Sequence, residues 1–247
     1  MALFRRIVAL GRIVRAVGHG VRGLWIIRRR FPHFTPAERD ACVEAWTRQM
    51  LAIFNIALRI EGERPEGGPL LLVANHTSWV DILAVQAART SRFVAKSDIR
   101  QWPLIGLVAG GVGTLFIERA SRRDALRTVQ RMAESLAAGD VITVFPEGTT
   151  TDGRSLLPFH ANLLQAAVAA GTPVQPVGIH FVDAATGLPT YVAAYAGDDT
   201  LWCSLWRTLT ADPLRAVVRF GTPGVAGGRD RRAWAQDLHA EVDVLRQ

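Results

Sequence analysis

Short apolar runs that suit β-strands alternate with helical stretches from about residue 59 onward, and this alternation limits the folds open to the chain more than any other feature. The expected strands are 70–74, 93–95, 114–117, 141–145 and 174–179, and the expected helices are 79–88, 122–138, about 161–170 and 230–245. Such alternation predicts an α/β fold with a central, mostly parallel sheet flanked by helices. Chemistry on such a sheet gathers where strands end and helices begin.

Residues 1–58 have a different pattern, which predicts an N-terminal amphipathic helical hairpin ahead of an α/β domain at 59–247. Thr35 and Glu38 fit a capping box with Pro36 between them, which predicts a second helix running to about Leu58. In the first helix, arginines are expected opposite an apolar face with spacings of three and four residues. That face comprises Leu3, Ile7, Leu10, Val14, Val17, Val21 and Trp25.

The net charge of +7 comes from the first 30 residues, which hold eight arginines and no acid. Residues 31–247 contain the other 21 basic residues and all 22 acidic ones, so they are nearly neutral. A spanning helix needs roughly 18 apolar residues, so this arm is expected to lie in the interface of an anionic bilayer. Arg12 and Arg15 interrupt the apolar centre that a signal peptide needs, and a nucleic-acid arm rarely has so regular an apolar face. Packing on its own domain stays open as an alternative.

The segment from Asn75 to Asp81 (Asn-His-Thr-Ser-Trp-Val-Asp) follows the expected strand 70–74. A histidine in a strand-to-helix turn, with a carboxylate one helical turn later, can be held in one tautomer and act as a general base. Ser78 and Asp81 equally fit a helix capping box, so a purely structural role is the alternative.

Three further segments carry candidate functional residues. Strand 114–117 is followed by Arg119, a residue type suited to phosphate or carboxylate recognition. Strand 141–145 runs through Pro146 into a polar loop that starts with Glu147, and 174–179 is a strand interrupted by a proline. The sequence has neither a Gly-x-Ser-x-Gly elbow nor a His-Glu-x-x-His zinc motif, and Cys42 and Cys203 are too far apart to suggest a disulfide framework or a cysteine metal site. Two free cysteines suggest a reducing compartment.

In this order and spacing the four segments resemble the motif blocks of the glycerolipid acyltransferase family typified by 1-acyl-sn-glycerol-3-phosphate acyltransferase, over about residues 70–180. The resemblance implies that His76 takes the proton from an acceptor hydroxyl, that Asp81 orients the imidazole, and that the hydroxyl attacks an acyl thioester directly. It also places a substrate-binding set in these blocks, namely Asn75, Ser78, Lys96, Arg119, Glu147, Gly148, Thr149 and Arg154. No bound cofactor or metal is implied.

One position departs from the family pattern. Many members have arginine after the threonine of the third block, where this chain has Thr150. Lys96, Arg119 and Arg154 can replace the missing charge, with Lys96 the better placed because it follows a strand. Alternatively, the acceptor is a lysolipid other than lysophosphatidate, such as lyso-ornithine lipid.

The expected function is therefore transfer of an acyl group from a thioester of coenzyme A or acyl carrier protein to a lysophospholipid. The enzyme is expected to be monotopic, to lie on the cytoplasmic face of a bacterial inner membrane, and to bind no nucleic acid. Two rivals are a thioesterase-like hydrolase using the same dyad, and a non-enzymatic membrane-binding module. The apolar run 102–108 fits an acyl-chain groove and an ordinary core helix equally well.

Overall fold

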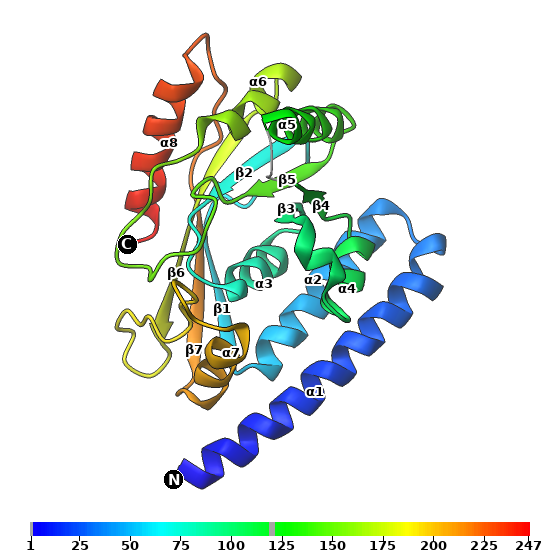
Figure 1. Cartoon of the computed structure of the whole chain (residues 1–247), viewed down its shortest axis with the longest axis vertical. Helices are drawn as coiled ribbons and strands as arrows, with labels where there is room; N and C mark the ends of the chain where they lie inside the picture. The colour runs from blue at the N-terminus through cyan, green and yellow to red at the C-terminus, as the bar shows by residue number, and fades with distance from the viewer. Residues whose placement is uncertain (1, 119–121) are drawn as a thin grey trace.

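The computed structural model of the chain describes residues 2–118 and 122–247, and places a seven-stranded sheet between two groups of helices (Figure 1). The strand order is β1-β7-β6-β2-β5-β3-β4. Every neighbouring pair is parallel except β6 and β7, which are antiparallel. The predicted α/β fold with a mostly parallel sheet is confirmed.

The elements follow one another with short connections over most of the chain. The strands are β1 (Ile56–Gly62), β2 (Leu70–Ala74), β3 (Arg92–Lys96), β4 (Leu115–Ile117), β5 (Val141–Val144), β6 (Val174–Asp183) and β7 (Leu214–Phe220). The helices are α1 (Ala2–Arg29), α2 (Pro36–Ile53), α3 (Trp79–Ala88), α4 (Ile105–Gly111), α5 (Arg122–Ala137), α6 (Gln165–Ala170), α7 (Leu201–Thr210) and α8 (Arg231–Leu245). Of these, β1, β7 and α7 were not expected from the sequence.

Each face of the sheet has its own apolar core. On one face α2, α3 and α7 pack against the strands, with Leu51, Val80 and Leu209 among the buried side chains. On the other face α5, α6 and α8 pack, with Met132 and Trp234 buried. Strand β2 lies between the two cores with all five residues buried, which explains its continuous apolar sequence.

The second helix ends earlier than expected. The predicted capping box is present, because Thr35 Oγ1 accepts the N–H of Glu38 and the Glu38 carboxylate accepts the N–H of Thr35. However, α2 ends at Ile53, and Asn55 adopts a left-handed conformation with φ of 63°. Asparagine is one of the few residues that tolerate this conformation at a helix end. The chain then enters β1, so the boundary drawn at residue 58 falls inside a strand.

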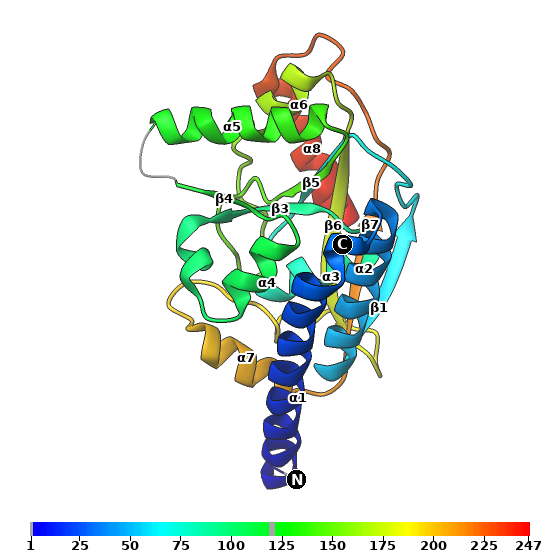
Figure 2. The ribbon, with the colours of Figure 1, turned by 90° about the vertical axis from the view of Figure 1, so that its right-hand side faces the viewer.

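Helix α1 runs along the outside of the molecule and packs on it through one face only (Figure 2). His19 stacks on Trp46 of α2 with ring centroids 4.6 Å apart, and the two residues exchange hydrogen bonds with each other's backbone carbonyl oxygen at 2.9 and 3.0 Å. Glycine is required at Gly23, where a Cβ would lie 2.7 Å from the Trp46 indole nitrogen. Packing on the domain, left open as an alternative, therefore occurs.

The predicted apolar face of α1 is a different face and remains exposed. Its seven side chains, which we call the apolar stripe, are each between 53% and 72% exposed: Leu3, Ile7, Leu10, Val14, Val17, Val21 and Trp25. Two arginines expected opposite this stripe turn toward the body, where Arg5 pairs with Asp212 at 2.6 Å and Arg12 donates to the Leu209 carbonyl at 2.8 Å. Within residues 2–118 and 122–247, no helix combines the length and apolar character that crossing a membrane requires.

Candidate active site

The sheet topology brings the first three sequence motifs to one edge. Strands β2, β5, β3 and β4 are adjacent and parallel, so their carboxyl ends lie side by side. His76 follows β2, Glu147 follows β5, and Lys96 ends β3. This edge is the place where an α/β sheet holds its chemistry.

His76 and Asp81 form a hydrogen-bonded pair at this edge. The Nδ1 atom of His76 lies 2.9 Å from Asp81 Oδ2. The Asp81 side chain is fully buried, whereas that of His76 is 17% exposed. Because the carboxylate oxygen can only accept, Nδ1 carries the proton and the lone pair resides on Nε2. The imidazole is thereby held in the tautomer that a general base needs.

Asp81 also caps helix α3, so the structural and functional interpretations of this motif hold together. Its Oδ2 accepts the backbone N–H groups of Thr77 at 2.6 Å and Ser78 at 2.8 Å, while Ser78 Oγ accepts the N–H of Val80 at 3.2 Å. The same carboxylate therefore fixes the start of α3 and the ring of His76.

The loop after β5 holds the backbone of His76 from both sides. Glu147 Oε1 accepts the His76 N–H at 2.6 Å, and the N–H of Thr151 donates to the His76 carbonyl at 3.0 Å. The second carboxylate oxygen of Glu147 accepts the N–H of Leu157 at 3.0 Å. Burial raises the pKa of Glu147, and the hydrogen bonds from Leu157 and His76 oppose that rise. The first and third motifs therefore form one rigid unit.

The fourth motif joins the same unit through Asn75. Its side-chain oxygen accepts the N–H of Ile179 at 2.7 Å, and its side-chain nitrogen donates to the carbonyl of Ile179 at 2.9 Å.

The ring of Phe145 stacks on that of His76 with centroids 3.9 Å apart and planes 8° from parallel. The imidazole is thus fixed in orientation by an aromatic face and a carboxylate together.

Three residues expected to bind substrate are buried and hydrogen-bonded within the protein. Asn75, Ser78 and Glu147 are each at most 4% exposed, and their polar side-chain atoms bond to backbone groups. These hydrogen bonds form because the residues lie at the ends of buried strands, where unpaired backbone groups need partners. These contacts position the turn that carries His76, and substrate binding by the three residues stays a prediction.

The other expected residues that the structure describes are exposed or partly exposed. Lys96 and Arg154 are exposed, and each has an acidic neighbour: Lys96 pairs with Asp98, and Arg154 lies 3.8 Å from Asp152. Thr149 is exposed. Gly148 adopts φ of 75°, a conformation that favours glycine. Arg119 lies outside the described residues.

Some residues that support the site were not expected. Phe145 stands in the third motif, directly before Pro146, and its position next to the loop was the available signal. Arg246, at the end of α8, donates to the carbonyl of Gly153 at 3.0 Å and so supports the loop that holds His76. No sequence pattern connects positions 93 residues apart, so this contact could not have been found without the structure.

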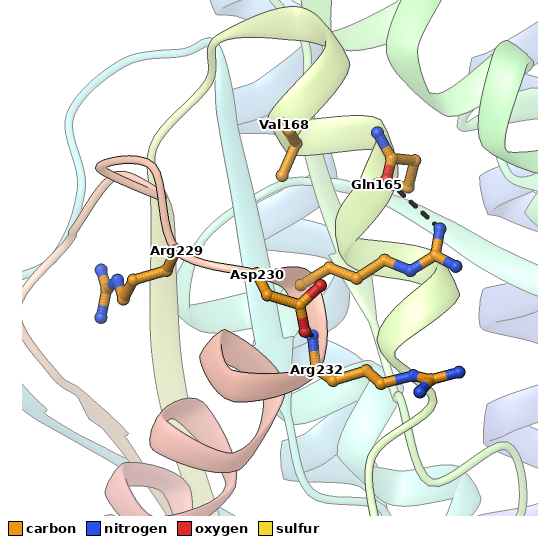
Figure 3. A pocket seen from close by; sticks show the side chains of 6 residues that line it. Gln165, Val168, Arg229, Asp230 and Arg232 are labelled. Atoms are coloured by element: carbon orange, nitrogen blue, oxygen red, sulfur yellow. Dashed lines mark hydrogen bonds between the residues drawn. The ribbon is translucent and has the colours of Figure 1, made fainter.

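Two hollows lie away from the catalytic edge. One, of about 570 Å³, is lined by Gln165, Val168 and residues 229–232 at the start of α8 (Figure 3). Two of the arginines that line it have partners within the protein, since Arg231 donates to Gln165 and Arg229 pairs with Asp237. The other, of about 720 Å³, lies at the amino ends of β2 and β6, beside Leu70 and Pro173. In the part of the chain that the structure describes, no three His, Cys, Asp or Glu side chains gather to hold a metal ion.

Comparison with known proteins agrees with the geometry. A family model described as Acyltransferase matches residues 55–180. The chain is 37% identical to the lyso-ornithine lipid O-acyltransferase of Pseudomonas aeruginosa, over 98% of this chain and 93% of that protein. It is 38% identical to the 1-acyl-sn-glycerol-3-phosphate acyltransferase of Neisseria gonorrhoeae, over 85% of this chain and 82% of that protein.

The fold also has a counterpart among solved structures. The 1-acyl-sn-glycerophosphate acyltransferase of Thermotoga maritima superposes with a TM-score of 0.76, covering 98% of this chain and 96% of that one at 19% identity. The family match spans the sheet edge that carries His76 and Asp81, together with all four motifs. Because that match covers half of the chain and a 37% identical relative aligns over nearly all of it, the protein belongs to the acyltransferase family and is an enzyme of lipid biosynthesis.

Proposed function

We propose that His76 is the general base of acyl transfer from a thioester to the hydroxyl of a lysolipid. The observation that carries the proposal is the 2.9 Å contact between His76 Nδ1 and Asp81 Oδ2, which leaves Nε2 as the basic nitrogen. Nε2 takes the hydroxyl proton as the oxygen attacks the thioester carbonyl. The carbon–sulfur bond then breaks, and the imidazolium returns the proton to the departing thiolate.

The hydrogen-bonded His76–Asp81 pair, in a sequence without a Gly-x-Ser-x-Gly nucleophile elbow, supports direct transfer without an acyl-enzyme. Asp81→Asn keeps a hydrogen-bonding side chain but removes the charge that stabilises the imidazolium. We expect His76→Ala and Asp81→Asn to lower kcat by about 10²- to 10⁴-fold. Circular dichroism of both variants should remain that of the wild type. Unchanged kcat in a folded His76→Ala enzyme would remove His76 from the mechanism.

We further propose that the preferred acceptor has a headgroup of low net charge, as lyso-ornithine lipid does. Two cations expected to bind the acceptor each have an acidic neighbour, Lys96 paired with Asp98 and Arg154 3.8 Å from Asp152. Thr150 replaces the arginine that would add a further positive charge for a phosphate. A headgroup with one carboxylate and one ammonium complements such pairs better than a phosphate monoester does. Two relatives, from Pseudomonas aeruginosa and Brucella abortus, are named lyso-ornithine lipid O-acyltransferases.

The acceptor is tested with purified protein, one acyl chain length, and lyso-ornithine lipid, lysophosphatidate and lysophosphatidylglycerol in parallel. The thioester is supplied both as acyl-coenzyme A and as acyl carrier protein, which identifies the donor. We expect the highest kcat/KM with lyso-ornithine lipid. A higher value with lysophosphatidate would overturn the charge argument and make lysophosphatidate the acceptor. Release of free fatty acid without any dependence on a lysolipid would identify a hydrolase.

Membrane association through α1, as a monotopic enzyme on the cytoplasmic face of the bacterial inner membrane, completes the proposal. The exposed apolar stripe and the exposed arginines beside it, such as Arg15 and Arg22, support an interfacial location on an anionic bilayer. The acceptor is a membrane lipid, so the enzyme gains by residing there. The arm 1–30 and the loop after β2 would then face the same membrane surface.

Surface substitutions test this better than deletion of residues 1–30, because deletion would also remove the His19–Trp46 stack from the fold. We expect the double variant Ile7→Ser/Val14→Ser to lose most of its flotation with phosphatidylglycerol vesicles. Leu126→Ser, an equally exposed position on α5, is the control and should float like the wild type. Equal flotation of both variants would remove the apolar stripe from membrane binding.

A further inference from the structure

Helix α7 connects the N-terminal helix to the catalytic turn. At one end of this connection, Trp79, the first residue of α3, donates its indole N–H to Ser204 Oγ at 3.2 Å. At the other, Arg12 of α1 donates to the Leu209 carbonyl at 2.8 Å. Figure 2 shows α7 beside the amino-terminal half of α1, close to the loop that follows β6. Any surface that α7 offers therefore lies between α1 and the turn that holds His76.

The outward side of α7 carries aromatic residues. Ser204, Thr208 and Leu209 form its buried side. On the other side Trp202 is 58% exposed and stacks on Trp206, with ring centroids 6.0 Å apart and planes 23° from parallel. Trp206 is only partly exposed and packs against the core, so Trp202 is the ring that faces water. An exposed tryptophan is costly on a soluble surface, whereas the membrane–water interface is the environment that tryptophan prefers.

The charge of the neighbouring helix decides which partner suits this surface. Residues 1–30 carry eight arginines and no acid. A second copy of the chain would bring the same arginines and repel, whereas anionic headgroups complement them. Helix α4 packs against α1 as well, with Leu104 beside Gly20, and exposes Ile105 and Leu107. Apolar side chains exposed on α1, α4 and α7, beside so many arginines, thus favour contact with lipid over contact with a protein partner.

We propose that the face of α7 formed by Trp202, Cys203 and Trp206 is a second lipid-contacting surface, separate from the apolar stripe of α1. It holds the catalytic turn at the level of the bilayer, where the hydroxyl of a lysolipid lies. The inference rests on the proposed membrane association. It adds a membrane contact through α7, which is hydrogen-bonded to Trp79 at the start of α3. It also gives the run 102–108 a place at the membrane, since α4 is not a buried core helix: Gly106 is its one buried residue.

A native cysteine makes the surface directly testable. Cys203 is exposed and lies next to Trp202, and Cys42→Ser leaves it as the single thiol. We label it with a polarity-sensitive nitrobenzoxadiazole probe and add vesicles of phosphatidylglycerol and phosphatidylcholine. We expect a blue shift and a several-fold rise in emission. The same probe at Leu126→Cys, in a chain with both native cysteines replaced by serine, should not respond, because α5 packs on the other face of the sheet.

The outcomes separate this proposal from those on which it rests. A silent probe at Cys203 on protein that still floats with vesicles would overturn the α7 contact while leaving docking through α1 intact. A silent probe on protein that does not float would overturn both. Neither result depends on catalysis, so failure of the acyl-transfer assay would leave the probe measurement valid.

A kinetic measurement distinguishes lipid contact from a structural role of the tryptophan. We expect Trp202→Ala to raise KM about tenfold for a lysolipid embedded in vesicles, in line with the loss of one buried aromatic side chain. With a short-chain, water-soluble lysolipid, kcat and KM should stay at wild-type values. Leu126→Ala is the matched control and should leave both reactions unchanged. An equal loss with both acceptors would show that Trp202 supports the fold, and would overturn the proposal.

Discussion

Glu147→Gln tests how the catalytic turn is held. The carboxylate of Glu147 accepts one backbone N–H on each oxygen, that of His76 at 2.6 Å and that of Leu157 at 3.0 Å. Glutamine has the same shape but only one oxygen, so its NH₂ group must face one of these two donors. Whichever way the amide turns, one partly buried N–H loses its acceptor.

Two opposing effects determine the size of the change. Leaving a buried N–H unpaired costs about 1–3 kcal/mol. Against this, the neutral amide avoids the cost of burying a carboxylate, which is the reason that the pKa of Glu147 is raised. The hydrogen bonds of Leu157 and His76 already offset part of that burial cost, so we expect the unpaired donor to dominate. The variant should be destabilised by about 1–3 kcal/mol, and the displaced His76 should lower kcat by about 10- to 100-fold.

The assay combines urea unfolding with steady-state kinetics. Glu241→Gln makes the same chemical change at an exposed position on α8 and should stay within about 0.5 kcal/mol of the wild type. A raised pKa means that the folded protein binds the proton more tightly than the unfolded chain does. Wild-type stability from this group therefore falls as pH rises from the ordinary glutamate pKa toward the raised one. The difference in unfolding free energy between wild type and Glu147→Gln should be largest at acidic pH. It should decrease as pH rises from the ordinary glutamate pKa to the raised one.

One result would refute this reasoning. If Glu147→Gln matched Glu241→Gln in both unfolding free energy and kcat, the two hydrogen bonds would not be holding His76. A loss of kcat without any loss of stability would instead place Glu147 in contact with the acceptor, as the sequence suggested.

Three further changes test the frame around the site. Asn75→Ala leaves the N–H and C=O of Ile179 unpaired in a buried position and should cost about 1–3 kcal/mol for each, measured by urea unfolding. Gly178→Ala places a Cβ 2.3 Å from backbone atoms of Leu245, so the end of α8 must shift and Tm must fall. Thr35→Ala removes the cap of α2 and should lower Tm by a few degrees. The Thr35 hydrogen bonds lower the pKa of Glu38, so the ionised Glu38 carboxylate stabilises the fold above the ordinary glutamate pKa. This stabilisation is lost as pH falls through the lowered pKa. The share of the Thr35→Ala destabilisation that comes from Glu38 should therefore disappear at low pH.

The catalytic turn was the part of the site most open to prediction. Its partners are within five residues, so the spacing of His76 and Asp81 already fixes their geometry once a strand meets a helix there. The capping and catalytic interpretations of Asp81 seemed to compete in the sequence. They are compatible in space, because one carboxylate oxygen reaches both the imidazole and the backbone of Ser78.

The partners of Asn75 and Glu147 could not be predicted in the same way. A motif indicates that a polar residue is needed, but its contact depends on which distant segment meets it. For Asn75 that segment is β6, 104 positions later in the chain. A buried polar side chain next to a strand end meets backbone groups that need partners before it meets substrate.

The errors in the fold have local causes. The sequence predicts the end of a helix where β1 begins, because Phe54, Ala57 and Leu58 continue the helical spacing. In the structure the left-handed Asn55 between them ends the helix. Strand β7 alternates arginine with apolar residues and was recognisable, whereas α7 is rich in tryptophan and threonine and has weak helix propensity. Its helical form depends on the cap at Thr200 and on packing against α1.

The arginines of α1 are divided between two roles, and this changes how binding to a membrane should be explained. Arg5 pairs with Asp212, and Arg12 is partly buried against α7, where burial and then the charge of Arg15 lower the pKa of its guanidinium. Six exposed arginines remain: Arg6, Arg15, Arg22, Arg28, Arg29 and Arg30. At about 1 kcal/mol each, they supply at most about 6 kcal/mol of attraction, which salt weakens. Charge alone would therefore give weak, salt-sensitive binding, and we expect the apolar stripe of α1 with Trp202 of α7 to provide the part of the affinity that persists at high ionic strength.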